Sequence, residues 1–518
     1  MNQQESPNLI ISGFKKIGPQ VRAAFLGALL FGVFSQGMGL FNKFSHHDDV
    51  GNLFDLGTTI SSGRWALQIV EWAEKLFYGT GNTSLPLFNG MLSILCIGAA
   101  SGLLVWLLKI RNKVYCALLG CVMVSFPVVT AAFAYMFTSH PYMICLLMMT
   151  GCACLICAKT PWWAKLFAAV LGGTAVGIYQ AYLPVLLIAI LCYDIQKLAD
   201  ENGLSGAFFK RIGIQVLCLL GVMLVYLAGN RFFLNKYQVE LSSYQGIDQA
   251  GNMTIQAFLD RCGRAYGEFF NPTRQVFADM YPGALHTIYL LMLVMDGLLV
   301  VRMIVMTAKK SIGQAAVLAL MFALIPLGCN LIYIMAENIH GLMVYGQVMQ
   351  VVLFIMLFDR VKPSSIQWKR AVSVAASAVL AVMAVMYARY DNQCYLKDAI
   401  HQQEAISYYT TLITRIKSQK GYRPDMGVYF ANAEVKTDDP TVYNMDELDF
   451  IRLNPYWHNS MEYLHAMTWY DFMMVWCGND FSRSWRIELE SLPEVQAMPS
   501  YPADGSIQVI EDTVIVKF

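Results

Sequence analysis

Long apolar stretches separated by short polar segments constrain this chain more than any other feature. A helix of about 20 apolar residues crosses the roughly 30 Å hydrocarbon core of a bilayer. Of the 518 residues, 56% are hydrophobic and 14% are charged. We therefore predict an α-helical polytopic membrane protein. The stretches that we expect to span are residues 23–41, 87–108, 114–136, 141–158, 164–178, 183–195, 212–230, 284–301, 313–335, 342–358 and 371–388.

The segment from 164 to 195 decides the number of spans, because it is long for one helix and short for two. The polar and aromatic cluster Tyr179-Gln180-Ala181-Tyr182 and the helix breaker Pro184 interrupt it, which favours two short helices. Two crossings also bring all the Lys/Arg clusters to one side, as the positive-inside rule requires of the cytoplasmic face. These clusters are Lys15/Lys16/Arg22, Lys109/Arg111/Lys113, Lys159/Lys165, Lys197/Lys210/Arg211, Arg302/Lys309/Lys310 and Arg360/Lys362/Lys369/Arg370. The pattern predicts about eleven spans, with the N-terminus inside and the C-terminus outside.

This orientation divides the chain into two predicted domains. A transmembrane domain, residues 1–388, has large outward loops at 42–86 and 231–283. An extracytoplasmic domain, residues 389–518, begins with an amphipathic helix from Asn392 to Lys417. Beyond it, the sequence predicts a strand at 427–431, a helix around 461–476 and a hairpin over 507–516, which together indicate a small α/β domain.

Four polar groups meet in the outward loops by this topology. They are His46-His47-Asp48-Asp49, Arg64, Tyr179-Gln180-Ala181-Tyr182 and Glu337-Asn338-Ile339-His340. A carboxylate that accepts a hydroxyl proton, with cations that hold a departing phosphate, suits sugar transfer from a lipid phosphate. The near-zero net charge of +1 gives no reason to expect a nucleic-acid partner. The expected partners are the bilayer, its lipids and what those lipids carry.

Each group also has a plainer interpretation. The acid pair suits a solvated loop, Arg64 an interfacial residue that snorkels, and Tyr179 and Tyr182 an aromatic belt. Glu337 and His340 could simply pair with each other. The two histidines could join the aspartates around a divalent cation, although adjacent residues seldom all reach one ion. No cofactor is therefore assigned, and a divalent cation stays open.

Three segments carry a resemblance to a known family. Phe44 to Asp49 with the helical stretch Gly51 to Trp72, then Ile178-Tyr179-Gln180-Ala181-Tyr182, then Tyr390-Asp391-Asn392-Gln393 together resemble the bacterial type II glucosyltransferase (Gtr) family. That family includes serotype-converting enzymes that add glucose branches to O-antigen. The order and spacing of the three segments carry the resemblance, which weakens over the last hundred residues.

The resemblance implies a fold similar to C-type glycosyltransferases (GT-C), with the active site on the periplasmic face of the bacterial inner membrane. The implied donor is undecaprenyl phosphate glucose, and the acceptor is a surface polysaccharide such as the O-antigen of lipopolysaccharide. Asp48 or Asp49 would be the base of an inverting transfer. Related enzymes often place an arginine in the outer loop that corresponds to residues 337–341, where this chain has His340.

The remaining site residues follow from the same comparison of topology and family. Arg64, Arg231 or His340 would hold the donor phosphate, and we expect Tyr179, Gln180, Tyr182 and Glu337 to contact the substrate. The sugar, the acceptor and the linkage stay open. A polyprenyl-linked lipid or polysaccharide transporter or flippase is the main alternative function, and a polysaccharide polymerase or ligase is a second. A transporter would need charges near mid-span, of which Asp296 is the clearest, although we expect it close enough to the inner end to face water.

Overall fold

The computed structural model describes residues 17–45, 47–53, 59–79, 84–242, 253–272, 283–337, 339–361, 366–432 and 466–518. The chain forms two compact units. The membrane unit holds residues 1–41 and 55–392, and the C-terminal unit holds residues 42–54 and 393–518. Segment 42–54, placed by the sequence in a loop of the membrane domain, therefore packs with the C-terminal unit.

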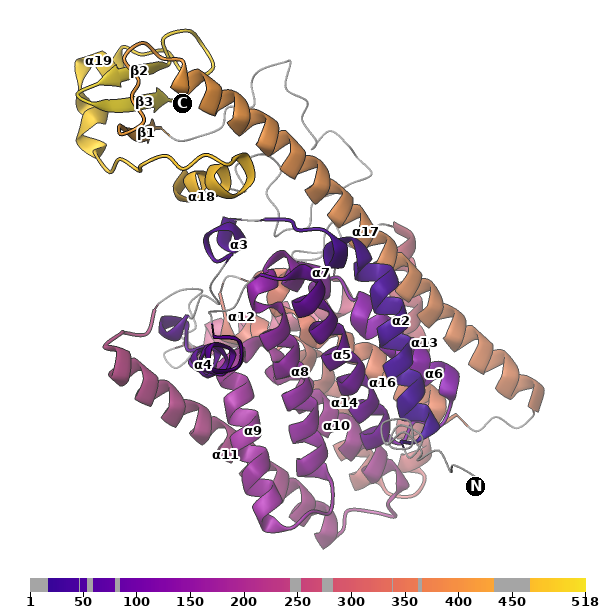
Figure 1. The fold of residues 1–518 in the computed structure, drawn as a ribbon. Helices are drawn as coiled ribbons and strands as arrows, with labels where there is room; N and C mark the ends of the chain where they lie inside the picture. The colour runs from indigo at the N-terminus through magenta and orange to yellow at the C-terminus, as the bar shows by residue number, and fades with distance from the viewer. Residues whose placement is uncertain are drawn as a thin grey trace, which may run out of the picture. The chain divides into compact units, whose positions relative to one another are not determined.

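Apolar helices dominate the membrane unit (Figure 1). Among the described residues, nine helical segments are long and apolar enough to cross a membrane. They are α2 (Pro19–Phe41), α5 (Pro86–Leu108), α6 with α7 (Lys113–Ser125, Val128–Ala134), α8 (Met136–Cys157), η2 with α10 (Gln180–Tyr182, Leu183–Asp200), α11 (Gly206–Tyr237), α13 (Gly283–Ala308), α14 (Ile312–Cys329) and α17 (Ile366–Lys417). Two shorter apolar helices are α9 (Trp162–Ile178) and the segment formed by η6 (Tyr345–Val348) with α16 (Met349–Asp359). Each predicted stretch falls on one of these helices, so the multi-span helical class is confirmed, while the count of eleven crossings stays a prediction.

The structure breaks the 164–195 segment at the predicted place. Helix α9 ends at Ile178, η2 makes a single turn, and α10 starts at Leu183. Pro184 lies in the first turn of α10, where its missing N–H leaves no helical hydrogen bond unmade. The prediction of two helices here is confirmed, and the turn brings Tyr179, Gln180 and Tyr182 to one end of both.

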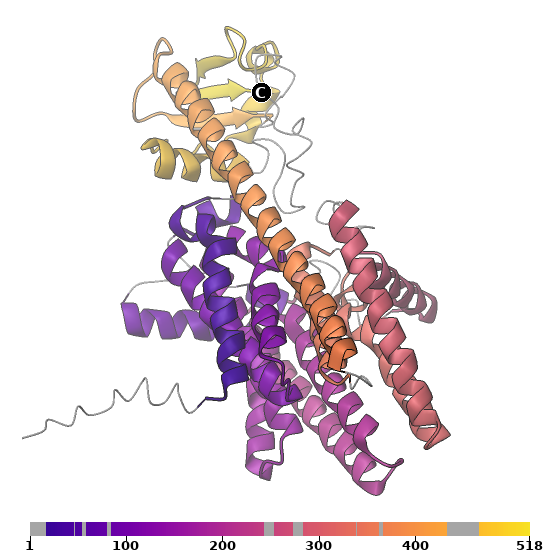
Figure 2. The same ribbon diagram turned by 90° about the vertical axis from the view of Figure 1, so that its right-hand side faces the viewer.

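Helices of the first half lie side by side in the membrane unit (Figure 2). Helix α2 packs on α5 and α6, α8 packs on α5 and α9, and α11 packs on α9. Helices α11 and α13 leave many apolar side chains exposed, including Leu217, Leu224 and Leu298, as expected of surfaces that face lipid. Shorter elements of this unit are η1 (Ile60–Ser62), α4 (Ala66–Tyr78), α12 (Ile255–Phe270), α15 (Ile332–Met335) and η5 (Gly341–Met343).

Helix α17 is longer than the sequence predicts. We expected a span over 371–388 and a separate helix from Asn392, but one helix of 52 residues runs through both. Asp391, at the predicted junction, is fully buried in the membrane unit. Its carboxylate accepts hydrogen bonds from Gln36 Nε2 (3.0 Å) and Thr130 Oγ1 (2.7 Å). Because these partners satisfy the acid, the helix continues across it.

The described part of the C-terminal unit holds helices and a three-stranded sheet of order β1-β3-β2. Strand β1 (Gly427–Ala431) runs parallel to β3 (Thr513–Lys517), and β2 (Ile507–Ile510) forms an antiparallel hairpin with β3. The predicted strand and hairpin are confirmed. Helix α18 (Ala466–Cys477) covers most of the helix predicted around 461–476, whose first residues, 461–465, lie outside the described part. The unit also contains α3 (His47–Gly51), η9 (Ile487–Ser491) and α19 (Pro493–Gln496).

Candidate functional site

Arg64 lies where η1 leads into α4, and two tyrosines fix its guanidinium. Its Nη1 donates a hydrogen bond to the Tyr142 hydroxyl (3.3 Å), and its Cζ lies 4.9 Å from the centre of the Tyr179 ring. The rings of Tyr142 and Tyr179 stack, with centroids 4.3 Å apart and planes 15° apart. A cation held over a tyrosine face gains from the ring quadrupole and loses little entropy on binding an anion. The contacts of Arg64 therefore support a second interpretation besides an interfacial residue that snorkels: a fixed guanidinium that can bind an anion.

The neighbouring residue, Trp65, anchors this loop in the helices. Its ring is 5% exposed and stacks on Phe233 of α11, with centroids 5.4 Å apart. Gly177 of α9 and Gly229 of α11 leave room for it, because a Cβ atom would come within 2.5 Å of the ring at Gly177 and 2.3 Å at Gly229. Two glycines on different helices thus create the space that sets the position of Arg64.

Gln180 and Tyr182 hold the same loop and the helices below it. Gln180 Nε2 donates to the Ser62 carbonyl (3.0 Å) and to the Tyr226 hydroxyl (3.2 Å). Tyr182 is fully buried and stacks on Tyr345, with centroids 5.2 Å apart. These contacts give both residues a positioning role. Their predicted contact with substrate stays a prediction.

His340 is the second cationic candidate near Arg64. Partial desolvation and then the positive charge of Arg64 lower the pKa of His340 below its usual value. The side chain is exposed, so an anionic ligand that bridges the two groups would remove their repulsion. The structure thus brings together Arg64 and His340, two of the three predicted phosphate ligands.

Arg231, a predicted phosphate ligand, and Glu337, a predicted substrate contact, make fewer contacts than Arg64. Arg231, on the last turns of α11, is exposed and has no hydrogen bond or ion pair with any residue that the structure describes. Helix α11 packs on η1, so Arg231 belongs to the same end of the unit as Arg64. Glu337 is exposed, and its backbone carbonyl accepts a hydrogen bond from Arg264 (3.2 Å). The roles of both residues stay predictions.

The structure adds a pair that the sequence analysis missed. Glu74 of α4 and His140 of α8 face each other, with Oε1 and Nε2 2.5 Å apart, and their side chains are 12% and 4% exposed. His140 lies two residues before Tyr142, the partner of Arg64. A carboxylate that orients an imidazole is a common proton-transfer unit. The signal available in the sequence was weak: one acid in an amphipathic helix and one histidine in a segment without Lys or Arg.

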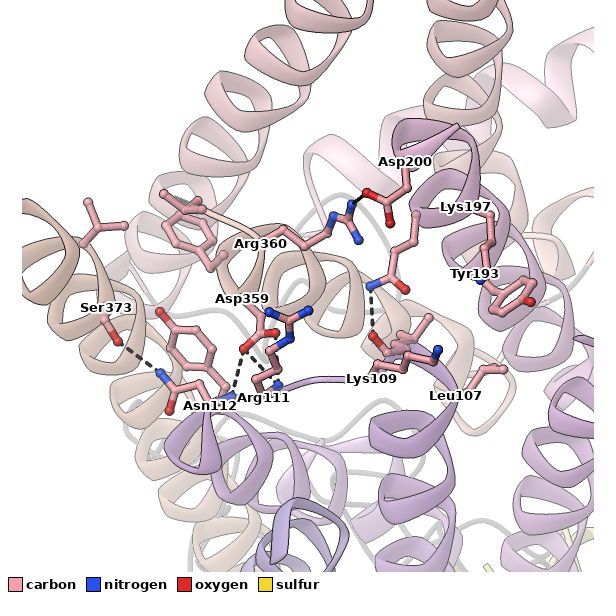
Figure 3. A pocket seen from close by; sticks show the side chains of 16 residues that line it. Leu107, Lys109, Arg111, Asn112, Tyr193, Lys197, Asp200, Asp359, Arg360 and Ser373 are labelled. Atoms are coloured by element: carbon pink, nitrogen blue, oxygen red, sulfur yellow. Dashed lines mark hydrogen bonds and ion pairs between the residues drawn. The ribbon is translucent and has the colours of Figure 1, made fainter. Parts of the chain in front are cut away.

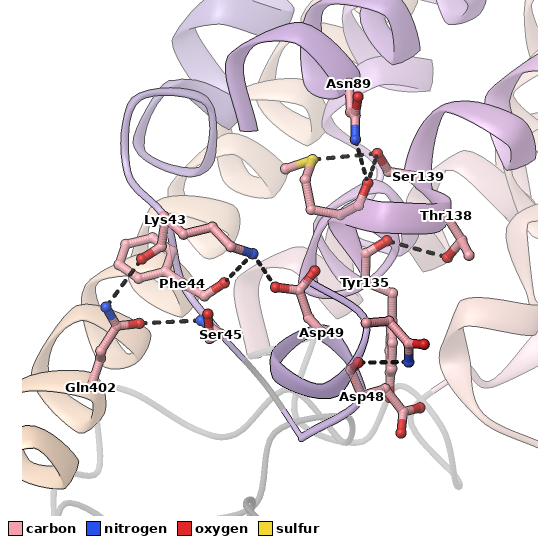
Figure 4. Close-up of polar contacts among 12 residues, drawn as sticks. Lys43, Phe44, Ser45, Asp48, Asp49, Asn89, Tyr135, Thr138, Ser139 and Gln402 are labelled. Atoms are coloured by element: carbon pink, nitrogen blue, oxygen red, sulfur yellow. Dashed lines mark hydrogen bonds and ion pairs between the residues drawn. The ribbon is translucent and has the colours of Figure 1, made fainter. Parts of the chain in front are cut away.

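The predicted acid pair lies in the C-terminal unit, on α3 (Figure 4). Asp49 is fully buried and forms an ion pair with Lys43. Burial lowers the pKa of Lys43, and the charge of Asp49 offsets part of that effect. Gln402 fixes the segment, because it accepts from the Ser45 N–H (3.2 Å) and donates to the Lys43 carbonyl (3.1 Å).

Asp48 differs from its neighbour. Its side chain is exposed, so solvent or a substrate hydroxyl can reach its carboxylate. His46 lies outside the described residues, as does the side chain of His47. Within the described part of the chain, no three His, Cys, Asp or Glu side chains come together as metal ligands would. Whether the two histidines bind a divalent cation is therefore not tested by the described residues.

Comparison with known proteins gives one finding. The family described as Glucosyl transferase GtrII matches residues 37–358, which is more than half of the chain. The matched range contains every candidate site residue in both units, from Asp48 to His340. No curated protein and no solved structure matches the chain. The family that the three sequence segments resembled is thus confirmed.

Proposed function

Because the chain belongs to the GtrII glucosyl transferase family, we propose that it transfers glucose from undecaprenyl phosphate glucose to a surface polysaccharide such as O-antigen. The reaction would take place at the periplasmic face of the bacterial inner membrane, where the positive-inside rule puts the Arg64 end of the helices. The family match is the observation that carries this proposal. The apolar helices support it, as does the position of the Arg64 guanidinium close enough to His340 to lower the pKa of that imidazole in addition to burial.

In the proposed reaction an acceptor hydroxyl attacks the anomeric carbon of glucose. A carboxylate base removes the hydroxyl proton as the new O–C bond forms, and the bond from the anomeric carbon to the phosphate oxygen breaks. The lipid phosphate leaves with the electron pair of that bond, and the configuration inverts. Arg64 would stabilise the charge on the departing phosphate, since a fixed cation at the developing charge lowers the barrier. His340 can donate a further hydrogen bond to the same group.

Asp48 is the favoured base of the acid pair. Its exposed carboxylate is accessible, whereas Asp49 is buried against Lys43. An ion-paired, buried acid has a structural task already, because its charge offsets the burial of the Lys43 ammonium. Glu74 is the competing base, because His140 orients its carboxylate.

The test is transfer of labelled glucose by the full-length protein in lipid nanodiscs, with undecaprenyl phosphate glucose and candidate surface glycans. Four variants at matched expression are compared: Asp48→Asn, Asp49→Asn, Glu74→Gln and, as control, Asp504→Asn, whose side chain is fully exposed. We expect Asp48→Asn to lower kcat by about 10²- to 10⁴-fold, the usual contribution of a general base. A loss confined to Glu74→Gln would move the base to that residue. Transfer that survives all substitutions would exclude these carboxylates from catalysis.

One observation favours the transporter alternative. Asp296 lies at the middle of α13, is 5% exposed, and neither carboxylate oxygen has a hydrogen-bond partner in the described structure. The expectation that it faces water near the inner end is therefore wrong. An unpartnered acid at mid-span is a common feature of proton-coupled transport. Lipid translocation by the wild type that Asp296→Asn abolishes, without glucose transfer, would establish that function instead.

A further inference from the structure

A polar hollow of about 590 Å³ lies at the Lys109 end of the membrane unit (Figure 3). Along α8, this is the end opposite Tyr142, the partner of Arg64. It forms where α5, α10 and α16 finish and α6 begins. A second hollow of about 630 Å³ adjoins it and shares Leu107, Lys109, Tyr193 and Lys197 as lining residues. Together they make one double hollow at the ends of the apolar helices.

The acidic residues of the double hollow already have partners. The carboxylate of Asp359 accepts hydrogen bonds from the backbone N–H groups of Arg111 (3.0 Å) and Asn112 (2.9 Å). Asp200 is paired with Arg360. The first acid therefore fixes the α5–α6 loop, and the second neutralises one arginine.

Four basic side chains of the double hollow have no such partner. Lys109, Arg111 and Lys197 line the first hollow, and Lys109, Lys159 and Lys197 line the second. None of these four pairs with a carboxylate among the residues that the structure describes, and the second hollow has no acidic lining residue. The double hollow is therefore strongly positive, and an anion would be attracted to it.

The backbone at Lys109 is unusual in a way that fits a binding role. Lys109 caps α5 in the left-handed conformation, with φ 52°. Glycine is the usual residue at this position, and a side chain there costs roughly 1 kcal/mol. Lys109 lines both hollows. Binding of an anion by its ammonium group would offset the strain of the left-handed backbone.

We propose that this double hollow binds the phosphate headgroup of an anionic membrane lipid. The positive-inside rule accounts for basic residues on this face but not for their convergence. Lys109 follows α5, Lys159 follows α8 and Lys197 belongs to the last turn of α10, so the fold gathers three separate clusters around one cavity. Basic pockets between membrane helices are a recurring site for anionic lipid headgroups.

The surroundings favour a lipid over a free anion. The second hollow is also lined by Val105, Trp106 and Ile110, apolar side chains that suit acyl chains next to the headgroup. Trp106, Trp162 and Trp163 are largely exposed at this end of the unit, as expected of aromatic residues at a membrane interface. The lipid site lies at the opposite end of the helices from Arg64. This inference therefore does not depend on the proposed transferase function.

Native mass spectrometry of the full-length protein in zwitterionic detergent tests this site. Phosphatidylglycerol, phosphatidylcholine and inorganic phosphate are titrated separately into the wild type and into two triple variants. The test variant is Lys109→Gln/Lys159→Gln/Lys197→Gln. The control is Lys210→Gln/Lys309→Gln/Lys310→Gln, which removes three exposed lysines of the same predicted face that line neither hollow.

We expect phosphatidylglycerol to bind the wild type more tightly than phosphatidylcholine. The test variant should lose on the order of a hundredfold in phosphatidylglycerol affinity, because each surface lysine contributes about fivefold, and the control should lose far less. Equal losses of phosphatidylglycerol affinity in both variants would mean that only the overall charge of this face matters, and would contradict a specific site at the double hollow. Competition by inorganic phosphate at lipid-like concentrations would overturn the lipid assignment. Should the test variant not fold, wild-type binding that is unaffected by salt would equally contradict the proposal.

Discussion

The Arg64 end and the Lys109 end of the membrane unit use positive charge in opposite ways. At the Arg64 end, the guanidinium lies on the Tyr179 ring and bonds to Tyr142, and it adds to the effect of burial in lowering the pKa of His340. At the Lys109 end, four basic side chains surround a double hollow without a carboxylate partner in the described structure. Both ends lie along helix α8 (Met136–Cys157): Arg64 bonds to Tyr142, and from Tyr142 to the last residue, Cys157, the helix is about 23 Å long.

The difference lies in how precisely each charge is held. A reaction requires a cation fixed within fractions of an ångström of the developing charge, and stacked tyrosines provide that rigidity. A lipid headgroup needs only a positive surface that it can enter and leave, for which lysines on flexible stems are suited. We therefore propose that the first end supports the transfer reaction and that the second end binds lipid.

The largest expected effect is that of Arg64→Ala. Loss of the fixed cation should lower kcat/KM for glucose transfer by about 10²- to 10³-fold, the range for removing one group that stabilises a developing charge. Arg64→Lys should recover part of the activity, because the charge returns without the planar contact to Tyr179. The measurement is labelled-glucose transfer in nanodiscs, with Arg302→Ala, an exposed arginine of α13, as the control. If Arg64→Ala transferred glucose at the wild-type rate, Arg64 would have no role in the reaction.

Substitution of Gly229 tests whether packing fixes Arg64. A Cβ atom there would lie 2.3 Å from the Trp65 ring, so Gly229→Ala should displace Trp65 and cost about 1–3 kcal/mol of stability. Because Arg64 directly precedes Trp65 in the chain, we expect transfer to fall by roughly tenfold as well. Gly213→Ala is a matched control on the same helix, since a Cβ atom at Gly213 meets nothing within 4 Å. Thermal unfolding in detergent and transfer rates measure the two effects, and identical behaviour of both variants would refute the packing argument.

The pH dependence of donor affinity tests whether His340 and Arg64 bind the same phosphate. The pKa of His340 is lowered in the free protein, and a bound phosphate should raise it by adding negative charge. Between these two pKa values the complex holds a proton that the free protein lacks, so donor binding should strengthen as pH falls through this window. We expect KM for the donor to decrease severalfold below about pH 6.5, and His340→Gln to remove the dependence. A KM that rises on acidification in the wild type would contradict the assignment.

The sequence predicted the membrane helices well because one physical requirement decides them. Backbone groups in hydrocarbon must bond internally, so every long apolar stretch becomes a helix. It did not predict that α17 continues through Asp391, because the partners that satisfy this acid, Gln36 and Thr130, are 355 and 261 positions away. Local hydropathy contains no information about such distant partners.

In the candidate site, too, the sequence predicted the features that depend on local pattern and missed those that depend on contacts between distant residues. The cluster at 179–182 was identified because polar residues interrupt an apolar run. Glu74 and His140 were missed because their pairing joins positions 66 residues apart and neither breaks a local pattern. Asp48 and Asp49 look equivalent in the sequence, yet the contact with Lys43 makes Asp49 a buried structural acid. Side-chain roles thus depend on contacts that only the folded chain defines.

The smallest expected effect is that of Asp359→Asn, which tests the support of the Lys109 end. Its carboxylate bonds to two backbone N–H groups of the α5–α6 loop, and an amide retains one oxygen without the charge. We expect a loss of about 1 kcal/mol, the difference between charged and neutral hydrogen bonds at a partly exposed site. Asp260→Asn, an exposed acid of α12, is the control in thermal unfolding. Because the loop carries Lys109 and Arg111, Asp359→Asn should also weaken binding of phosphatidylglycerol; unchanged stability and lipid affinity together would mean that the loop is held by other contacts and that the acid does not organise the hollow.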